Sequence, residues 1–81
     1  MPRLSSKADK DKKLVRLGAA IRAKRKGLGI SQEELAIISG VERSNMGKIE
    51  RGENNVSILN LVRIADALDS KAADILTDAG L

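Results

Sequence analysis

Residues Ile30–Gly52 read ISQEELAIISGVERSNMGKIERG and carry the strongest structural signal in the chain. Ser31 is followed three residues later by Glu34, a pairing in which each side chain bonds the other residue's backbone N–H at the start of a helix. Gly40 interrupts the helical pattern, and glycine readily takes the left-handed conformation that lets a chain leave a helix and turn. A second glycine, Gly52, ends the pattern. The stretch therefore predicts two short helices joined by a tight turn, at about 31–39 and about 42–51.

The second of these helices has two different sides. At about 100° per residue, Met46 and Ile49 lie on one side of the helical wheel together with Glu50. The other side carries cations, a hydroxyl and a glycine: Arg43, Ser44, Gly47, Lys48 and Arg51. A face of donors with no apolar anchor suits base edges and phosphates better than a protein groove. We interpret 31–51 as a helix-turn-helix, which lays its second helix in a DNA groove; the alternative is an ordinary solvated surface.

Two residues on this side attract particular attention. Arg43 lies near the helix N-terminus, where a guanidinium can contact guanine O6 and N7 together, worth about 1–3 kcal/mol of base discrimination. Gly47 lies in the middle of the face, although glycine inside a helix costs about 0.5–1 kcal/mol relative to alanine. Either the missing side chain lets the helix approach DNA closely, or the glycine is a neutral accident.

The composition excludes several classes of protein. The chain has 81 residues and contains no aromatic residue, histidine or cysteine. A chain of this length buries only about 60% of its unfolded surface, so a partner subunit would add stability. Single-stranded nucleic acid is usually bound by aromatic stacking, which this chain cannot supply. The commonest general base, the thiol nucleophile and the soft metal ligands are also missing. We therefore expect no enzyme, no cofactor and no metal site.

The charge is unevenly distributed. Residues 1–57 hold 13 Lys or Arg against 7 acids, and residues 58–81 hold 2 against 4, giving net charges of +6 and −2. The basic part contains the predicted helix-turn-helix, as expected of a protein that displaces counterions from phosphates. No apolar run approaches the length that spans a bilayer, and the N-terminus is charged rather than signal-like. The sequence therefore predicts a soluble cytoplasmic protein without a membrane partner.

The chain before the motif reads as scaffold. Apolar residues recur there at helical spacing: Leu14, Leu17, Ile21 and Leu28. They predict a first helix that ends at Gly27 or Gly29. Residues 1–13 are a polar, basic segment that either begins this helix or forms an arm, and its lysines are candidate contacts to the DNA backbone. We place the domain at 14–77 and a C-terminal tail at 78–81.

After the motif, Ser57 predicts the N-cap of a helix that runs to about Leu68. The apolar stripe of this helix is expected to be mostly core: Ile58, Leu61, Val62, Ile64, Ala65 and Leu68. Ser70 is expected to cap a last short helix at 71–77. In that helix, Ile75 and Leu76 either fold back on the first helix or form part of a two-fold dimer contact.

Several sequence blocks occur in an order and spacing typical of one family: SQEELA from Ser31, SGV from Ser39, KIERG from Lys48 and NVSILNLVRIADAL from Asn55. Together they resemble the Cro/C1-type (Xre family) helix-turn-helix regulators over about Leu14–Leu76, and most of all the small controller proteins of restriction–modification systems. Phage repressors and antitoxins share this scaffold. The resemblance implies an all-α fold, a compact five-helix bundle of the lambda-repressor-like type. It also implies a homodimer on a pseudo-palindromic operator in double-stranded DNA, with half-sites about 34 Å apart.

The resemblance further implies roles for individual residues. Those that match base-reading positions are Arg43, Ser44 and Lys48. Those that match contacts to the sugar-phosphate backbone are Gln32, Arg51, Asn54 and Asn55. Arg25 and Glu50 match an ion pair that ties the first helix to the recognition helix, so we expect them to be scaffold rather than DNA contacts.

Three positions depart from the family pattern. Glu42 stands where Ser, Thr or Asp is frequent, and glutamate is a poorer residue for starting a helix. The Glu42 carboxylate would also repel phosphate unless it accepts a hydrogen bond from cytosine N4. Asn45 replaces a frequent tyrosine and is expected to exchange packing for a polar contact to the DNA backbone. Gly47 replaces a side chain that the family normally keeps. These departures bear on the operator sequence rather than on the fold.

The main alternative function is a protein-interaction module that uses the same fold to bridge other proteins, with weak DNA binding. A DNA reader should lose affinity steeply as salt rises, whereas a bridging module should form no sequence-preferring DNA complex. A third interpretation, a basic amphipathic helix at Leu14–Lys26 lying on a membrane, lacks the aromatic anchors such helices use. The sequence indicates no small-molecule effector.

Overall fold

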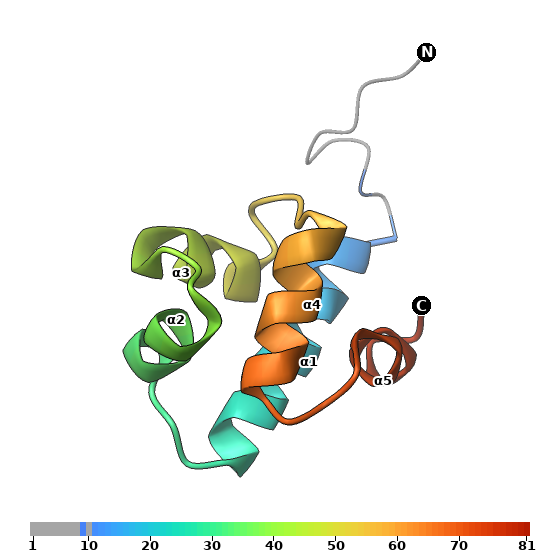
Figure 1. The fold of residues 1–81 in the computed structure, drawn as a ribbon. Coiled ribbons are helices and arrows are strands. Elements are labelled where there is room, and N and C mark those ends of the chain that lie inside the picture. The colour runs from blue at the N-terminus through green and yellow to red at the C-terminus, as the bar shows by residue number, and fades with distance from the viewer. Residues whose placement is uncertain (1–8, 10) are drawn as a thin grey trace.

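The computed structural model describes residue 9 and residues 11–81, which form five helices: α1 Lys13–Gly27, α2 Gln32–Ser39, α3 Arg43–Arg51, α4 Ile58–Ala67 and α5 Ala72–Asp78 (Figure 1). This described part of the chain contains no strand, so the predicted all-α fold is confirmed. The helix α1 packs against α3 and α5, while α4 packs against α2 and α5. As a result, α2 and α3 lie together on one side of the body and α5 lies on the other (Figure 1). The predicted N-terminal arm falls mostly outside the described residues.

The first helix begins at a cap that sequence reasoning missed. The carboxylate of Asp9 accepts from the backbone N–H of Lys13 at 2.7 Å and from that of Leu14 at 3.1 Å. These two N–H groups have no partner inside the helix, so the carboxylate satisfies them and suits the positive end of the helix dipole. The helix ends at Gly27, one of the two predicted positions.

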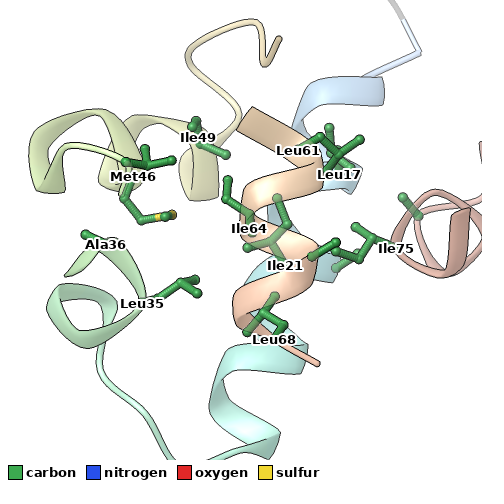
Figure 2. Packing of buried hydrophobic residues seen from close by; sticks show 14 residues of the cluster. Leu17, Ile21, Leu35, Ala36, Met46, Ile49, Leu61, Ile64, Leu68 and Ile75 are labelled. Atoms are coloured by element: carbon green, nitrogen blue, oxygen red, sulfur yellow. The ribbon is translucent and has the colours of Figure 1, made fainter. Parts of the chain in front are cut away.

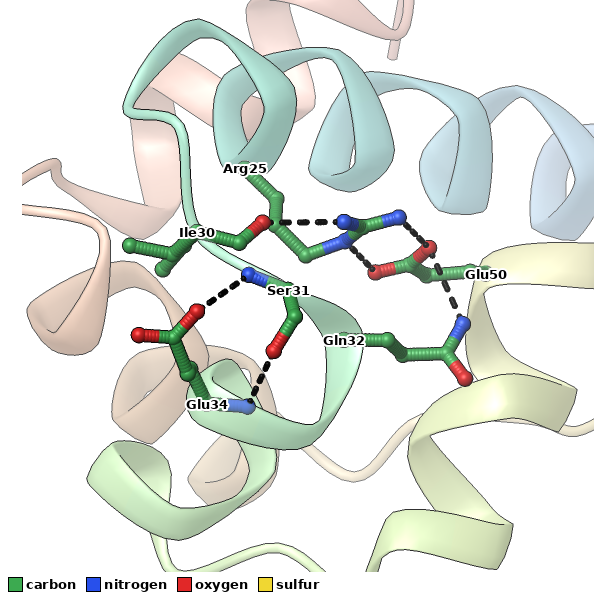
Figure 3. A network of polar contacts seen from close by, with 6 residues as sticks. All are labelled: Arg25, Ile30, Ser31, Gln32, Glu34 and Glu50. Atoms are coloured by element: carbon green, nitrogen blue, oxygen red, sulfur yellow. Dashed lines mark hydrogen bonds and ion pairs between the residues drawn. The ribbon is translucent and has the colours of Figure 1, made fainter.

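The turn between α2 and α3 forms as the sequence predicts. The Ser31 hydroxyl accepts from the Glu34 N–H at 3.0 Å, and the Glu34 carboxylate accepts from the Ser31 N–H at 2.9 Å (Figure 3). Gly40 closes α2 with φ 74°, a conformation that costs glycine little because it has no Cβ. The side chain of Val41, only 5% exposed, then packs into the core before α3 begins. The helix-turn-helix is thus defined by local hydrogen bonds and one left-handed residue.

A wholly aliphatic core joins all five helices (Figure 2). Each of the five helices contributes one of its largest fully buried side chains: Ile21, Leu35, Met46, Ile64 and Ile75. Burying a side chain of this size is worth about 1.5–3 kcal/mol, so a core of this kind can hold a small domain without aromatic residues. The core lies between the helix-turn-helix and α5, and it supports α3 from behind.

The prediction for the apolar stripe of α4 is only partly right. Leu61, Ile64 and Ala65 are buried as expected. Ile58 is 71% exposed and Val62 is 40% exposed, so these two belong to the outer surface. The reason is geometric: one helix in this bundle buries a single face, and the predicted stripe was wider than that face.

The predictions for the last helix need two corrections. Ser70 does not cap α5, because Lys71 occupies the N-cap position and makes no side-chain cap bond. Ile75 is fully buried in the core of its own subunit, so it cannot be a dimer contact. Leu76 is half-buried and packs against the same core. Because α5 packs on both α1 and α4, the fold-back alternative is the one that the structure shows.

Candidate nucleic-acid interface

The outer face of α3 divides from its inner face as the sequence predicts. Arg43, Ser44 and Lys48 are exposed, whereas Met46 and Ile49 are buried. Among the residues that the structure describes, neither Arg43 nor Lys48 takes part in an ion pair. The face therefore presents two positive charges that are free to meet an anionic partner.

The predicted ion pair between α1 and α3 is confirmed. Arg25 donates from Nε to Glu50 Oε2 at 2.8 Å and from Nη2 to Oε1 at 3.1 Å (Figure 3). Its third nitrogen donates to the carbonyl of Ile30 at 3.0 Å, at the entrance to α2. The two side chains are only 11% and 3% exposed. The Arg25 guanidinium thus fixes α3 and the start of α2 to α1. The two parallel bonds to Glu50 set the orientation of α3 relative to α1.

A direct backbone contact also seats α3 on α1. Gly18 of α1 faces the carbonyl groups of Ile49 and Glu50, and a Cβ at position 18 would lie 2.6 Å from the Glu50 oxygen. No real side chain tolerates that distance, so only glycine fits here. The sequence analysis missed this role of Gly18, since a glycine inside an apolar helical pattern is not distinctive by itself.

Gln32 is the first residue of α2, and its side chain reaches across to α3. Its amide nitrogen donates to Glu50 Oε1 at 3.2 Å (Figure 3). Glu50 therefore accepts from both Arg25 and Gln32, and the amide of Gln32 is held beside α3. The phosphate contact proposed for Gln32 would use a side chain that is already positioned.

Gly47 is buried, which corrects the picture of an open gap on the outer face. A Cβ at this position would lie 3.2 Å from Arg51 Nη1 and 3.3 Å from Gln32 Oε1. The ends of these two side chains thus lie close to where a Cβ would be, and both would have to shift slightly to admit one. Close approach of DNA at Gly47 stays a prediction, and the structure adds a second reason for glycine here.

The chain after α3 is tied together by polar contacts. Arg51 donates to Glu53 from Nε at 2.8 Å and from Nη2 at 3.3 Å, with both side chains more than half exposed. This hydrogen bonding lowers the pKa of the Glu53 carboxyl below its ordinary value. Asn54 donates to the side-chain oxygen of Asn45 at 3.0 Å, joining the loop to α3.

The helix α3 starts without a side-chain cap, as expected from a glutamate at position 42. Glu42 occupies the N-cap position and makes no side-chain cap bond. Its carboxylate accepts instead from the Ser44 hydroxyl at 3.1 Å. Ser44 would have to leave this contact, or share it, to read a base.

The residues predicted to contact DNA come from α3, the start of α2 and the loop after α3, and two contacts join these segments: Gln32 with Glu50, and Asn54 with Asn45. Asn55 is exposed within that loop. A second residue that the sequence does not single out, besides Gly18, is Arg22 of α1, which lines a surface hollow together with Arg25, Gln32, Glu50 and Arg51. Its position three residues before Arg25, on the same side of α1, is the signal that could have found it.

Two classes of site are not found in the described residues. Over residues 9 and 11–81, none of the helices has the length and apolar character needed to cross a membrane. Within the same residues, no three acidic side chains gather closely enough to hold a metal ion.

Comparison with known proteins identifies the family. A helix-turn-helix family model matches residues 21–75. The control protein C.SmaI of Serratia marcescens is 40% identical over 65 residues, which cover 80% of this chain and 77% of that protein. The solved structure of the restriction-modification controller protein C.AhdI from Aeromonas hydrophila is 44% identical with a TM-score of 0.75, covering 76% of this chain and 94% of that one. The clp gene regulator ClgR of Corynebacterium glutamicum is 35% identical with a TM-score of 0.81, covering 84% of this chain and 87% of that one.

These matches confirm the lambda-repressor-like fold and place the chain among non-enzymatic regulators. The family match covers both helices of the motif, the whole of α4 and parts of α1 and α5. This protein belongs to the Cro/C1-type (XRE) family of DNA-binding helix-turn-helix regulators.

Proposed function

We propose that this protein is a sequence-specific transcriptional regulator that binds a pseudo-palindromic operator in double-stranded DNA as a homodimer. The observation that carries the proposal is the pair of exposed cations on α3, Arg43 and Lys48, which have no acidic partner in the described part of the chain. A recognition helix bearing such side chains can enter the major groove and bond base edges. The protein would act in the cytoplasm, where bacterial operators are found.

Each residue of the face has a proposed part in the complex. Arg43, Ser44 and Lys48 read base edges, with Arg43 bonding a guanine. The backbone contacts come from Gln32, Asn45, Arg51, Asn54 and Asn55. The phosphate bound by the Gln32 amide would also meet the first backbone N–H groups of α2, because the positive end of a helix favours an anion. Arg25 and Glu50 hold these groups in place without touching DNA.

The regulated genes are proposed to be those of a restriction–modification system. Two of the relatives above are named as controller proteins, one of them of restriction–modification. C.AhdI is also a short chain, since a match over 76% of this 81-residue chain covers 94% of it. The likeness to ClgR, a clp gene regulator, leaves other target genes as the alternative.

The homodimer is proposed to form through the exposed apolar face of α4 rather than through α5. Ile58, Leu59 and Val62 are 71%, 57% and 40% exposed and lie next to one another on the helical wheel. The same face carries Arg63 and Asp66, which have opposite charges one turn apart. In a two-fold pairing of α4 with α4 of a second copy, each Arg63 can face the other copy's Asp66.

A salt titration with matched variants tests DNA binding. We expect the affinity of the wild type for duplex DNA to fall steeply with salt, with a log–log slope of about −0.9 for each phosphate contact. Replacing Arg43 and Lys48 together by Gln should remove most sequence-preferring binding. Replacing Arg16, which lies beside α5, and Lys71, which precedes α5, by Gln removes the same charge away from α2 and α3 (Figure 1) and should leave the sequence preference intact. Equal effects of the two double variants would contradict the proposed recognition face.

The second candidate function is bridging of other proteins, and one observation favours it. Ile37 and Ile38 of α2 are 74% and 61% exposed, an apolar pair outside the proposed dimer face. Adjacent exposed aliphatic side chains of this kind can mark a protein contact. If duplex DNA binds without sequence preference at moderate salt, this function becomes the better one.

A further inference from the structure

Glu42 is an exposed residue at the start of α3, and the proposed function assigns it no contact with DNA. It occupies the N-cap position without a side-chain cap bond, and its carboxylate Oε1 accepts from the Ser44 hydroxyl at 3.1 Å. Glu42 forms no ion pair with any residue in the described part of the chain. Because Ser44 belongs to the outer face of α3, this hydrogen bond places the carboxylate beside that face.

The same hydrogen bond decides what Ser44 can offer to a base. A hydroxyl has one hydrogen and two lone pairs, whereas an ionised carboxylate has only acceptors. The hydrogen of Ser44 is therefore given to Glu42, and lone pairs of both side chains are left free to accept. As long as this hydrogen bond is kept, Glu42 and Ser44 form a pair of acceptors next to the donors of Arg43.

Acceptors in the major groove select bases that show a donor there. Guanine shows the acceptors O6 and N7, and thymine shows the acceptor O4. Adenine shows the N6 amino group beside the acceptor N7, whereas cytosine shows the N4 amino group and no acceptor. A carboxylate is therefore repelled by part of every base edge except that of cytosine. The DNA phosphates repel it as well, so Glu42 contributes selectivity rather than overall affinity.

We propose that Glu42 is a base reader that, together with Ser44, accepts from the N4 amino group of a cytosine. Ser44 need not leave Glu42 to take its own part in base reading. Two residues rise about 3 Å along a helix, less than the step of about 3.4 Å between base pairs. The cytosine therefore lies within one base pair of the guanine that Arg43 bonds. The inference rests on the proposed function, because it adds a base contact to the same recognition helix.

The test selects bound sequences from a random duplex pool with Glu42→Gln and, as its control, Glu53→Gln. Both variants lose one exposed carboxylate that is bonded to a proposed DNA contact, since Glu53 is bonded to Arg51. For the wild type we expect a cytosine in each half-site, within one base pair of the position that Arg43→Ala affects. Glu42→Gln should lower the preference for this cytosine about tenfold and favour adenine, because an amide matches adenine N6 and N7. Glu53→Gln should leave every base preference unchanged.

Three further measurements separate a base contact from an effect of charge or folding. On a duplex of arbitrary sequence, both Gln variants should bind several-fold more tightly than the wild type, because each loses a charge that repels phosphates. Thermal unfolding of Glu42→Gln should match that of the wild type, since Glu42 has no cap bond to lose. Ser44→Ala should weaken the preference for the same cytosine and leave the other positions unchanged.

Several outcomes would overturn this inference and leave the proposed function standing. One is an inverted repeat whose base preferences are the same for the wild type and Glu42→Gln. Another is a half-site with no cytosine within one base pair of the Arg43 position. A third is Ser44→Ala losing a preference for guanine or thymine, which would make the Ser44 hydroxyl a donor to the base. A wild type that enriches no inverted repeat contradicts the proposed function itself.

Discussion

The helices α3 and α4 both turn an apolar side to the core, and they differ in what they leave outside. The outer face of α3 carries Arg43 and Lys48, whereas the outer face of α4 carries Ile58 and Val62. Cations in water attract a polyanion, and exposed aliphatic side chains gain free energy when another apolar surface covers them. The inner faces of the two helices thus contribute to one core, whereas the outer face of α3 suits the proposed DNA contact and the outer face of α4 suits the proposed dimer contact.

The two helices are also held in different ways. The helix α4 packs through apolar side chains such as Leu61 and Ile64, and such packing is non-directional. The helix α3 has fewer apolar residues in the core and adds a buried, two-bond ion pair from Glu50 to Arg25. Directional bonds of this kind set the orientation of a helix as well as its position. That is what a helix needs if its side chains are to match base edges.

The largest expected effect comes from breaking the bond that holds α3. Glu50→Ala leaves the Arg25 guanidinium in its partly buried place without a counter-charge, which should cost about 3–5 kcal/mol of unfolding free energy. Denaturant unfolding measures it. The control is Glu53→Ala, which breaks an exposed pair and should leave stability nearly unchanged. If the two variants are equally mild, the ion pair is not what fixes α3.

The outer face of α4 can be tested by placing a charge on it. Val62→Asp should raise the dissociation constant of the dimer about tenfold or more, because each copy would then bring a carboxylate into an apolar contact. Sedimentation at several concentrations measures it, with circular dichroism to check folding. Val15→Asp is the matched control, since Val15 is 42% exposed against 40% for Val62 and lies on α1. A dimer that survives Val62→Asp but not Val15→Asp would move the interface to α1.

A smaller effect is expected at Gly47, in the middle of α3. Gly47→Ala should raise stability by about 0.5–1 kcal/mol, because alanine favours the helix. The new Cβ would push on the ends of the Arg51 and Gln32 side chains, which lie 3.2 and 3.3 Å from its position. DNA affinity should therefore fall while the melting temperature rises. If affinity rises together with stability, the glycine has no part in DNA binding.

The smallest effect concerns the capping box at the start of α2. The hydrogen bond from the Ser31 backbone N–H lowers the pKa of Glu34 below its ordinary value of 4.5. The contribution of this hydrogen bond to the free energy of unfolding is therefore fully present above about pH 4.5 and is lost as the pH falls through the lowered pKa of Glu34. Glu34→Gln, which keeps an acceptor but cannot titrate, should lose less stability between neutral and acidic pH than the wild type. Parallel pH profiles would show that the capping box does not respond to protonation.

Much of this fold could be predicted because its signals are local. The capping box at Ser31 and the left-handed turn at Gly40 involve neighbouring residues, so the sequence alone shows them. The division of α3 into two faces also follows from spacing within one helix. The Arg25–Glu50 pair joins residues 25 positions apart, and only the resemblance to a family made it predictable.

What could not be predicted depends on how the helices pack. Whether Ile75 faced its own core or a second subunit depends on where α5 lies. The exposure of Ile58 and Val62 depends on how much of α4 its neighbours cover. The close contact of Gly18 and the place of Arg22 in the hollow likewise need the relative position of α1 and α3. Residue spacing carries no information on these distances.

The central claim is that the outer face of α3 reads duplex DNA in two symmetry-related copies. Selection of bound sequences from a random duplex pool, with the wild type and Arg43→Ala side by side, tests it most directly. The wild type should enrich an inverted repeat with half-site centres about one helical turn apart. Arg43→Ala should keep the repeat and lose preference at one base pair per half-site, worth about 1–3 kcal/mol. A wild type that enriches no inverted repeat at moderate salt would contradict the account.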